Sequence, residues 1–326
     1  MTRSGTGETP ARPSAPPPAG RQRRSARALI YQALLLMLVA LLLGFLADNT
    51  LRNMAQRGIQ SGFDFLWQPA GFEIGESLFG FDASQAYWLA FLTGLGNTLR
   101  TALAGMVLAT VLGVLLGIGR FARSALLRGV CGAYVELFRN IPLLLQLLTG
   151  YLLLAQALPP FEQPLTLGAV QLSKSGLLWQ DKPDTEALFT LSPEFMALTL
   201  GLGLYTAAFI AEVVRAGIAA VPQGQTEAAA ALGLSRRPTL RRVVLPQALR
   251  VIVPPLTNQY LNLTKNSSLA VAIGYPDVVS IANTALNQTG RAVECLTVVM
   301  AIYLGLSLLT SWLMNRYNAH VALHEG

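Results

Sequence analysis

The sequence predicts an all-α integral membrane protein with about six transmembrane helices. The chain has 326 residues, of which 52% are hydrophobic and only 13% are charged, whereas soluble domains carry about 25% charged residues. Uncharged stretches long enough to cross a bilayer recur along the chain, and the loops between them are alternately basic and acidic. Because Lys and Arg are retained in the cytoplasm, this alternation predicts a multi-pass protein with cytoplasmic N- and C-termini.

The first 87 residues are predicted to form a tail, a helix and an outer loop. Residues 1–27 are rich in Pro and Arg and poor in apolar side chains, so a disordered cytoplasmic tail is expected. Residues 28–47 carry no charge and are expected to form the first transmembrane helix. Phe45 stands where a signal-peptide cleavage site needs a small residue, which favours an uncleaved helix. Residues 48–87, rich in acids and aromatics, are expected as a periplasmic loop.

Residues 88–318 are predicted to form the membrane core. A second acidic outer loop is expected over residues 159–193, and residues 319–326 are expected as a short cytoplasmic tail that holds both histidines. The remaining helices are predicted at about 88–119, 129–158, 193–220, from 251 onward, and at 295–315.

Residues 222–246 form a highly charged, helix-capable stretch between two apolar regions. Thr226 can cap a helix, the residues from Glu227 to Leu232 are almost all strong helix formers, and Gly233 can end the helix. The stretch predicts a short exposed helix at the cytoplasmic membrane surface, suited to contact a soluble partner. A surface helix that packs only on its own domain is the alternative. Its basic flank contains Arg236, Arg237, Arg241 and Arg242.

A polar segment re-enters the membrane after this stretch. Helix breaks and amides are costly against lipid, so a segment that contains them is expected to line a water-accessible cavity or to be enclosed by protein. Lys265 is the one lysine in a predicted crossing and can recognise a passing carboxylate. In the alternative, Lys265 neutralises backbone carbonyls or pairs with Asp277. The expected breaks are at Pro254, Pro255, Gly274 and Pro276, and the pathway candidates are Asn262, Lys265, Asn266, Ser267 and Ser268.

Several classes of protein and site are disfavoured by the residues present. Lys174, Lys182 and Lys265 follow Ser, Asp and Thr, so the chain has no Gly-Lys-Ser/Thr phosphate loop and is not expected to be an enzyme. The isolated Cys131 and Cys295 indicate neither a disulfide framework nor a metal site. The net charge of +7 comes from the tail and the loops, which indicates membrane topology and not nucleic-acid binding.

The spacing of the charged stretch resembles a known motif. Glu227-Ala228-Ala229, three residues, Gly233, nine residues and then Val243-x-Leu245-Pro246 are similar to the EAA loop of membrane subunits of binding-protein-dependent ABC importers. Further matches resemble the polar amino acid class, and especially the general L-amino acid permease type. They are Gly96-Asn-Thr-Leu99, Glu136-Leu-Phe-Arg-Asn-Ile-Pro142, Ala208 to Ile218, Lys265-Asn-Ser-Ser-Leu269, Gly62 to Ile74 and Asn287 to Glu294.

The resemblance covers about residues 28–318 and implies a type I ABC importer transmembrane-domain fold. It implies that Thr226, Glu227, Ala228, Ala229 and Gly233 couple to the ATPase, and that ATP and Mg are bound by that partner and not by this chain. The implied partners are two ATP-binding subunits, a related second permease subunit and a periplasmic amino acid binding protein. The implied activity is ATP-driven import of L-amino acids across a bacterial inner membrane. At positions 266–267 this chain has Asn-Ser where many relatives have Asp-Thr.

An ion-gradient-driven secondary amino acid transporter is the alternative function. Such a transporter needs acids buried in the membrane as ion sites, whereas Glu136, Glu212 and Glu294 are all expected near membrane ends. A different substrate class, such as a sugar or a metal, is also compatible with the coupling loop. The sequence leaves open which amino acids are carried and which residues contact them.

Overall fold

The computed structural model describes residues 26–56, 58, 61–77, 80–179 and 189–322. The chain divides into two compact units, residues 1–60 and 61–326. In the first unit, α1 (Ala26–Gln56) is a single apolar helix that contains the whole predicted span 28–47. It continues nine residues further, and Arg52 and Asp48 form an exposed ion pair of 2.9 Å one turn apart. The remainder of the predicted tail, residues 1–25, lies outside the described residues.

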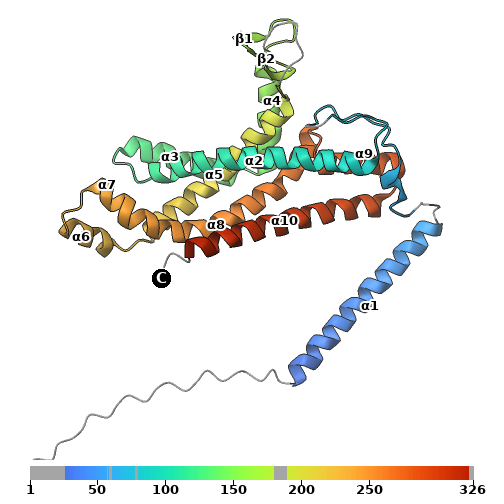
Figure 1. The fold of residues 1–326 in the computed structure, drawn as a ribbon, viewed down its shortest axis with the longest axis horizontal. Helices are drawn as coiled ribbons and strands as arrows, with labels where there is room; N and C mark the ends of the chain where they lie inside the picture. Colours follow the sequence, from blue (N-terminus) through green and yellow to red (C-terminus); the bar gives the residue numbers. More distant parts are fainter. Residues whose placement is uncertain (1–25, 57, 59–60, 78–79, 180–188, 323–326) are drawn as a thin grey trace, which may run out of the picture. The chain divides into compact units, whose positions relative to one another are not determined.

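The second unit is a bundle of helices (Figure 1). Among the described residues of the whole chain, four helices are long and apolar enough to cross a membrane, and the number rises to six if each of two bent helix pairs is one span. The predicted helical membrane fold is therefore confirmed. The helices are α2 (Tyr87–Gly119), α3 (Ala125–Asn140), α4 (Leu143–Ala157), α5 (Pro193–Ala219), α6 (Gln223–Ala231), α7 (Arg236–Thr239), α8 (Leu245–Asn266), α9 (Val278–Thr289) and α10 (Ala292–Ala322).

The two ends of this bundle carry opposite charge. The α2–α3 turn and the α6–α7 region lie together at one end (Figure 1), and they hold arginines such as Arg120, Arg123 and Arg236. The loop before α2 and the turn between α9 and α10 lie at the other end, with acids such as Asp64 and Glu294. This separation is the one that retention of basic loops in the cytoplasm predicts.

The predicted single helix over 129–158 is wrong. The chain forms α3 and α4, which are bent by 106° at Ile141 and Pro142. Proline clashes with a helical residue before it, and Ile141 is accordingly extended, with φ −95° and ψ 131°. The Gln146 amide donates hydrogen bonds to the carbonyls of Phe138 (2.9 Å) and Ile141 (2.8 Å). The break thus has a side chain that satisfies backbone groups which the bend releases.

The predicted loop over 159–193 contains a small antiparallel sheet in the order β1-β2-β3-β4. Its strands are β1 (Leu165–Leu167), β2 (Val170–Ser173), β3 (Gly176–Trp179) and β4 (Phe189–Leu191). Gly168 has φ +61° in the tight turn between β1 and β2, a conformation that glycine adopts without strain. The strand β4 leads directly into Ser192, whose hydroxyl caps α5 by accepting a 3.0 Å hydrogen bond from the Phe195 N–H.

The polar segment bends later than predicted. The helix α8 passes through Pro254 and Pro255 without ending, and a 3-10 turn over Ser267–Ile273 follows it. The chain changes direction at Gly274, which has φ +79°, and α9 follows at a bend of 50°. Of the predicted breaks, those at Gly274 and Pro276 fall in this turn.

Candidate functional site

The helix α6 projects from the basic end of the bundle (Figure 1). Every residue of α6 is described, and Ala229 alone is buried. Leu232, directly after the helix, is 82% exposed. Exposed Ala228 and Ala230 flank the buried alanine. The helix therefore presents a polar first half and a small apolar second half that its own domain does not cover.

The start of α6 differs from the prediction. The helix begins at Gln223 after Pro222, so Thr226 lies within it and is not its cap. The Thr226 hydroxyl instead donates a 2.7 Å hydrogen bond to the Gln223 carbonyl. Pro222 fixes the chain direction before the first turn, a position where a missing N–H costs little.

Gly233 ends the helix. It has φ +77°, its N–H donates to the Ala230 carbonyl at 2.9 Å, and the Leu234 N–H donates to the Ala229 carbonyl at 3.0 Å. These paired bonds form a Schellman motif, which uses a left-handed residue that is usually glycine. The motif turns the chain sharply toward the basic flank.

We expect Gly233→Val to destabilise this end of α6. A β-branched residue at positive φ costs about 1–2 kcal/mol, so the last turn should fray while the buried bundle is unaffected. Amide hydrogen exchange of the intact protein should rise in residues 228–234 and stay unchanged in α5. Gly224→Val, at a glycine of the same exposed helix with ordinary φ, is the control. Equal protection of residues 228–234 in both variants would contradict the assignment.

The basic flank of α6 is also exposed. Arg236 and Arg237 lie on α7, and Arg241 and Arg242 lie on the π-helical turn that leads into α8. The exposed α6 surface and these four guanidinium groups lie together on one projecting segment, which we call the α6 knob (residues 222–242).

The base of the α6 knob is anchored by an ion cluster. Glu212, near the end of α5, contacts Arg120 of the α2 end at 2.5 Å and Arg215 at 2.5 Å. Glu212 and Arg215 are thus paired one turn apart within α5, and Arg120 adds a link between helices that the sequence does not reveal. This cluster ties the end of α2 to the last turns of α5, which ends at Ala219 shortly before α6 begins at Gln223.

The five pathway candidates lie at the end of α8, but they do not share one environment. Lys265 and Ser268 line a cavity of about 530 Å³ together with Tyr303 and Ser307. Asn262 is exposed and Asn266 is half-buried. Ser267 is fully buried, and its hydroxyl donates a 2.7 Å hydrogen bond to the Thr264 carbonyl.

Asp277 is not the partner of Lys265, so the ion-pair half of the alternative is wrong, whereas neutralisation of backbone carbonyls by Lys265 stays a prediction. The Asp277 carboxylate caps α9 by accepting a 2.8 Å hydrogen bond from the Ser280 N–H, and the Tyr303 hydroxyl lies 3.4 Å from its other oxygen. Among the residues that the structure describes, Lys265 forms no ion pair. Its ammonium group remains available to a ligand in the cavity.

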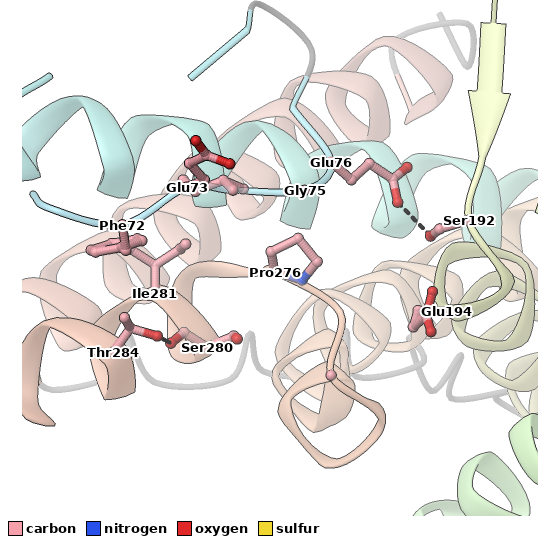
Figure 2. Close-up of a pocket in the computed structure, with 12 residues that line it drawn as sticks. Phe72, Glu73, Gly75, Glu76, Ser192, Glu194, Pro276, Ser280, Ile281 and Thr284 are labelled. Atoms are coloured by element: carbon pink, nitrogen blue, oxygen red, sulfur yellow. Dashed lines mark hydrogen bonds between the residues drawn. The ribbon is translucent and has the colours of Figure 1, made fainter. Parts of the chain in front are cut away.

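Another cavity, of about 460 Å³, lies at the acidic end, where no local sequence pattern predicts one. Figure 2 shows Glu73 and Glu76 on one side, Ser192 and Glu194 on another, and Ser280 and Thr284 of α9 below. Residues 61–77 form the loop on the rim of this cavity, and we call this loop the outer strap. The Asn97 amide beneath it donates to the carbonyls of Glu76 (2.7 Å) and Pro276 (2.9 Å), so the strap is held to α2.

Both ends of the outer strap are pinned by ion pairs. At one end the Arg291 guanidinium binds the Asp64 carboxylate and the Gly62 carbonyl. At the other end Glu76 contacts Arg100 of α2 at 2.6 Å and accepts a hydrogen bond from Ser192 (Figure 2). Burial raises the pKa of the Glu76 carboxyl above its ordinary value, against the opposing effects of the Ser192 hydrogen bond and the Arg100 charge.

We expect Glu76→Ala to destabilise the folded protein by about 1.5–3 kcal/mol, because it removes the carboxylate that accepts hydrogen bonds from both Arg100 and Ser192. The Arg100 side chain is only 14% exposed. Glu73→Ala is the matched control, since Glu73 lies three residues away on the same strap and is exposed. Thermal unfolding in detergent should separate the two variants, and equal midpoints would contradict the structural role of the Glu76–Arg100 pair.

The raised pKa of Glu76 sets the sign of a pH effect. The folded protein holds this proton more tightly than the unfolded chain, whose Glu pKa is 4.5. Stability contributed by this group therefore increases as the pH falls toward 4.5 and decreases as it rises. The midpoint difference between wild type and Glu76→Gln should shift in favour of wild type between pH 7 and pH 5.

Comparison with known proteins places this geometry in a family. Residues 105–322 match the family described as "Binding-protein-dependent transport system inner membrane component". The chain is 39% identical to the general L-amino acid transport system permease protein AapQ of Rhizobium johnstonii, over 92% of this chain and 93% of that protein. It is 40% identical to the putative amino-acid ABC transporter permease protein YhdX of Escherichia coli K12, over 92% and 95% of the two chains.

Solved structures share the fold. A crystal structure of an amino acid ABC transporter with histidines is 27% identical, with a TM-score of 0.57 over 72% of this chain and 95% of that chain. The methionine ABC transporter MetNI, in an inward-facing conformation, is 22% identical with a TM-score of 0.51, which supports the fold alone. This chain belongs to the family of binding-protein-dependent transport system inner membrane components and has the fold of a type I ABC importer permease.

Proposed function

We propose that this permease carries L-amino acids, with broad specificity, across a bacterial inner membrane, driven by ATP that a partner subunit hydrolyses. The observation that carries the proposal is the identity of 39–40% to two amino acid permeases over 92% of the chain. Similarity of that extent includes the α6 knob. It also includes the cavity lined by Lys265 and Ser268 at the end of α8, which we call the α8 cavity. The basic end of the bundle would face the cytoplasm, with both termini on that side.

The proposed complex contains two ATP-binding subunits, a second permease subunit that is related to this chain, and a periplasmic amino acid binding protein. The α6 knob supports the first of these, because a helix with an uncovered apolar surface and a basic flank suits a docking site. ATP and Mg would belong to the ATP-binding subunits, since this chain has no phosphate loop. Docking would use Glu227, Ala228 and the turn at Gly233.

In the proposed mechanism, closure of the ATP-binding pair moves α6 inward and α5 with it. The membrane helices would then exchange between inward-open and outward-open arrangements. A ligand shifts such an equilibrium only through its different affinity for the two states. The loaded binding protein and ATP would therefore both favour the outward-open state.

The α8 cavity is the proposed place of substrate contact. Lys265 presents an ammonium group to a cavity of about 530 Å³ that Ser268 also lines, and a cation suits a carboxylate. The Ser268 hydroxyl already donates a 2.8 Å hydrogen bond to the Lys265 carbonyl, so Ser268 would help to position Lys265. Asn262 and Asn266 are proposed as further pathway residues. Ser267 would act indirectly, since its hydroxyl is already used in the Thr264 hydrogen bond.

The test is uptake by the assembled complex in lipid vesicles. Labelled glutamate, glutamine, arginine or leucine would be supplied with binding protein outside and ATP inside. We expect uptake that requires ATP, that persists when ion gradients are collapsed, and that several unlabelled amino acids inhibit. Uptake driven by an ion gradient without ATP would support the secondary-transporter alternative, and inhibition by sugars alone would contradict the proposed substrate class.

A further inference from the structure

An ion pair joins α2 to α5 toward the basic end of the bundle, and Glu76 of the outer strap bridges the two helices toward the acidic end. Toward the acidic end, Arg100 of α2 binds Glu76 at 2.6 Å, Glu76 also accepts from Ser192 at the start of α5, and Arg100 donates to the Thr190 carbonyl at 3.2 Å. At the basic end, Arg120 binds Glu212 of α5 at 2.5 Å. The two helices are thus connected close to both ends of α5.

Between these connections, glycines bring the two helix backbones into direct contact. A Cβ atom at Gly113 would lie 2.6 Å from the Ile210 Cβ, and one at Gly117 would lie 2.7 Å from the Val214 Cβ. On α5, a Cβ atom at Gly203 would lie 2.5 Å from the Leu108 Cδ2 of α2. Packing of this closeness interlocks side chains of one helix with the backbone of the other, so sliding or rotation requires the two helices to separate first.

The same pair is continuous with functional segments on both sides. At the basic end, α5 leads into the α6 knob with three intervening residues. At the acidic end, β4 leads through Ser192 into α5, and the outer strap is bound to Arg100 and Asn97 of α2. A displacement applied to α6 therefore reaches the sheet and the strap through one interlocked pair of helices.

We propose that α2 and α5 form a rigid transmission strut that carries motion of the α6 knob to the outer strap and the β-sheet. Arg120 is a positioning residue in this strut, since it ties α2 to the end of α5 from which α6 projects. Opening and closing of the pathway takes place where other helices or another subunit meet the strut, and not within it. This inference rests on the proposed ATP-driven transport.

The first test joins α2 to α5 by an engineered disulfide. The ideal Cβ position at Gly105 on α2 lies 3.6 Å from the Leu202 Cβ on α5, which is within the usual range of a disulfide, about 3.5–4.5 Å. Gly105→Cys/Leu202→Cys would be introduced in a Cys131→Ala/Cys295→Ala background and assayed in the full complex. After oxidation, ATP-dependent uptake should stay within about twofold of the reduced sample, because a rigid pair loses no needed motion on cross-linking.

Loss of more than about tenfold on oxidation, with recovery on reduction, would overturn the strut. If the reduced variant fails to assemble, Leu108→Cys/Gly203→Cys gives a second comparison. The ideal Cβ position at Gly203 lies 3.1 Å from the Leu108 Cβ, so the pair must move apart by about 0.4 Å to reach the usual disulfide range. The wild-type complex separates the two proposals: absence of ATP-driven uptake there contradicts the proposed function, whereas loss confined to the oxidised variant contradicts the strut alone.

The second test breaks the ionic link at the α6 end. Arg120→Gln removes the ion pair between Arg120 and Glu212 that links α2 to α5. It leaves Glu212 paired with Arg215 within α5. Coupling between two sites of a protein typically amounts to a factor of about 5 to 150. We therefore expect the number of ATP molecules hydrolysed per amino acid imported to rise about fivefold, at the lower end of that range. This ratio would not change if Arg120 only stabilised the fold, since misfolded complexes lose both activities together.

Arg123→Gln is the matched control. Arg123 lies three residues away in the same turn and is exposed, and its side chain forms no ion pair with a described residue. Its ratio of ATP to substrate should equal that of wild type. An equal ratio in Arg120→Gln and Arg123→Gln would overturn the positioning role of Arg120.

Discussion

Glu227→Lys is expected to abolish ATP-dependent uptake while leaving the permease inserted and folded. Glu227 lies in the exposed middle of α6, and its side chain forms no ion pair with a described residue. The substitution changes the charge by two units within a surface that already carries four exposed arginines nearby. In the proposed complex, a cation of the ATP-binding subunit that pairs with Glu227 would instead face a lysine, and like charges opposed across an interface cost several kcal/mol, so docking should fall by well over tenfold.

Two measurements distinguish lost docking from lost folding. The detergent-solubilised variant should unfold within about 1 °C of wild type, because exposed substitutions usually change stability by less than about 0.5 kcal/mol. It should no longer retain the ATP-binding subunit during purification. Glu162→Lys makes the same charge change at an exposed position of the opposite loop and should keep both subunit binding and ATP hydrolysis. Wild-type uptake in Glu227→Lys would count against docking at α6.

The sequence predicts features that depend on neighbouring residues. The apolar length of residues 28–47 and of 193–220 is sufficient to place α1 and α5, because a membrane helix satisfies its own backbone groups. Gly233 marks the end of α6 for a similarly local reason, since few other residues adopt its left-handed conformation. The prediction that Thr226 caps α6 was wrong because the helix begins after Pro222, one turn earlier.

Other features depend on residues that are distant in the sequence. The outer strap is held by Glu76 with Arg100 and by Asp64 with Arg291, and the second pair is separated by 227 residues. Nothing in the local pattern around Asp64 selects Arg291 from the other arginines. The outer cavity that the strap borders could not be predicted for the same reason. The β-sheet and the bend at Pro142 did have local signals, in the alternation of residues 165–173 and in the X-Pro step.

Gly113→Ala is expected to destabilise the permease, although the same change usually stabilises a helix. Alanine gains about 1 kcal/mol over glycine inside a helix through its smaller loss of backbone entropy. At Gly113, however, the new methyl group would lie 2.6 Å from the Ile210 Cβ and 2.9 Å from the Ala207 carbonyl oxygen. The backbone of α5 cannot yield locally, so α2 and α5 must separate, and overpacking of this kind costs about 1–3 kcal/mol.

Gly132→Ala in α3 is the control with the opposite sign. No atom lies within 4 Å of a Cβ placed at Gly132, so the helix propensity acts there without a clash. We expect the midpoint of thermal unfolding to fall by roughly 3–10 °C in Gly113→Ala and to stay level or rise in Gly132→Ala. Because the two variants carry the same chemical change, a difference in sign isolates the close approach of α2 and α5. An equal midpoint in both variants would mean that the two backbones can separate at little cost, and the interlocked packing of this pair would then be refuted.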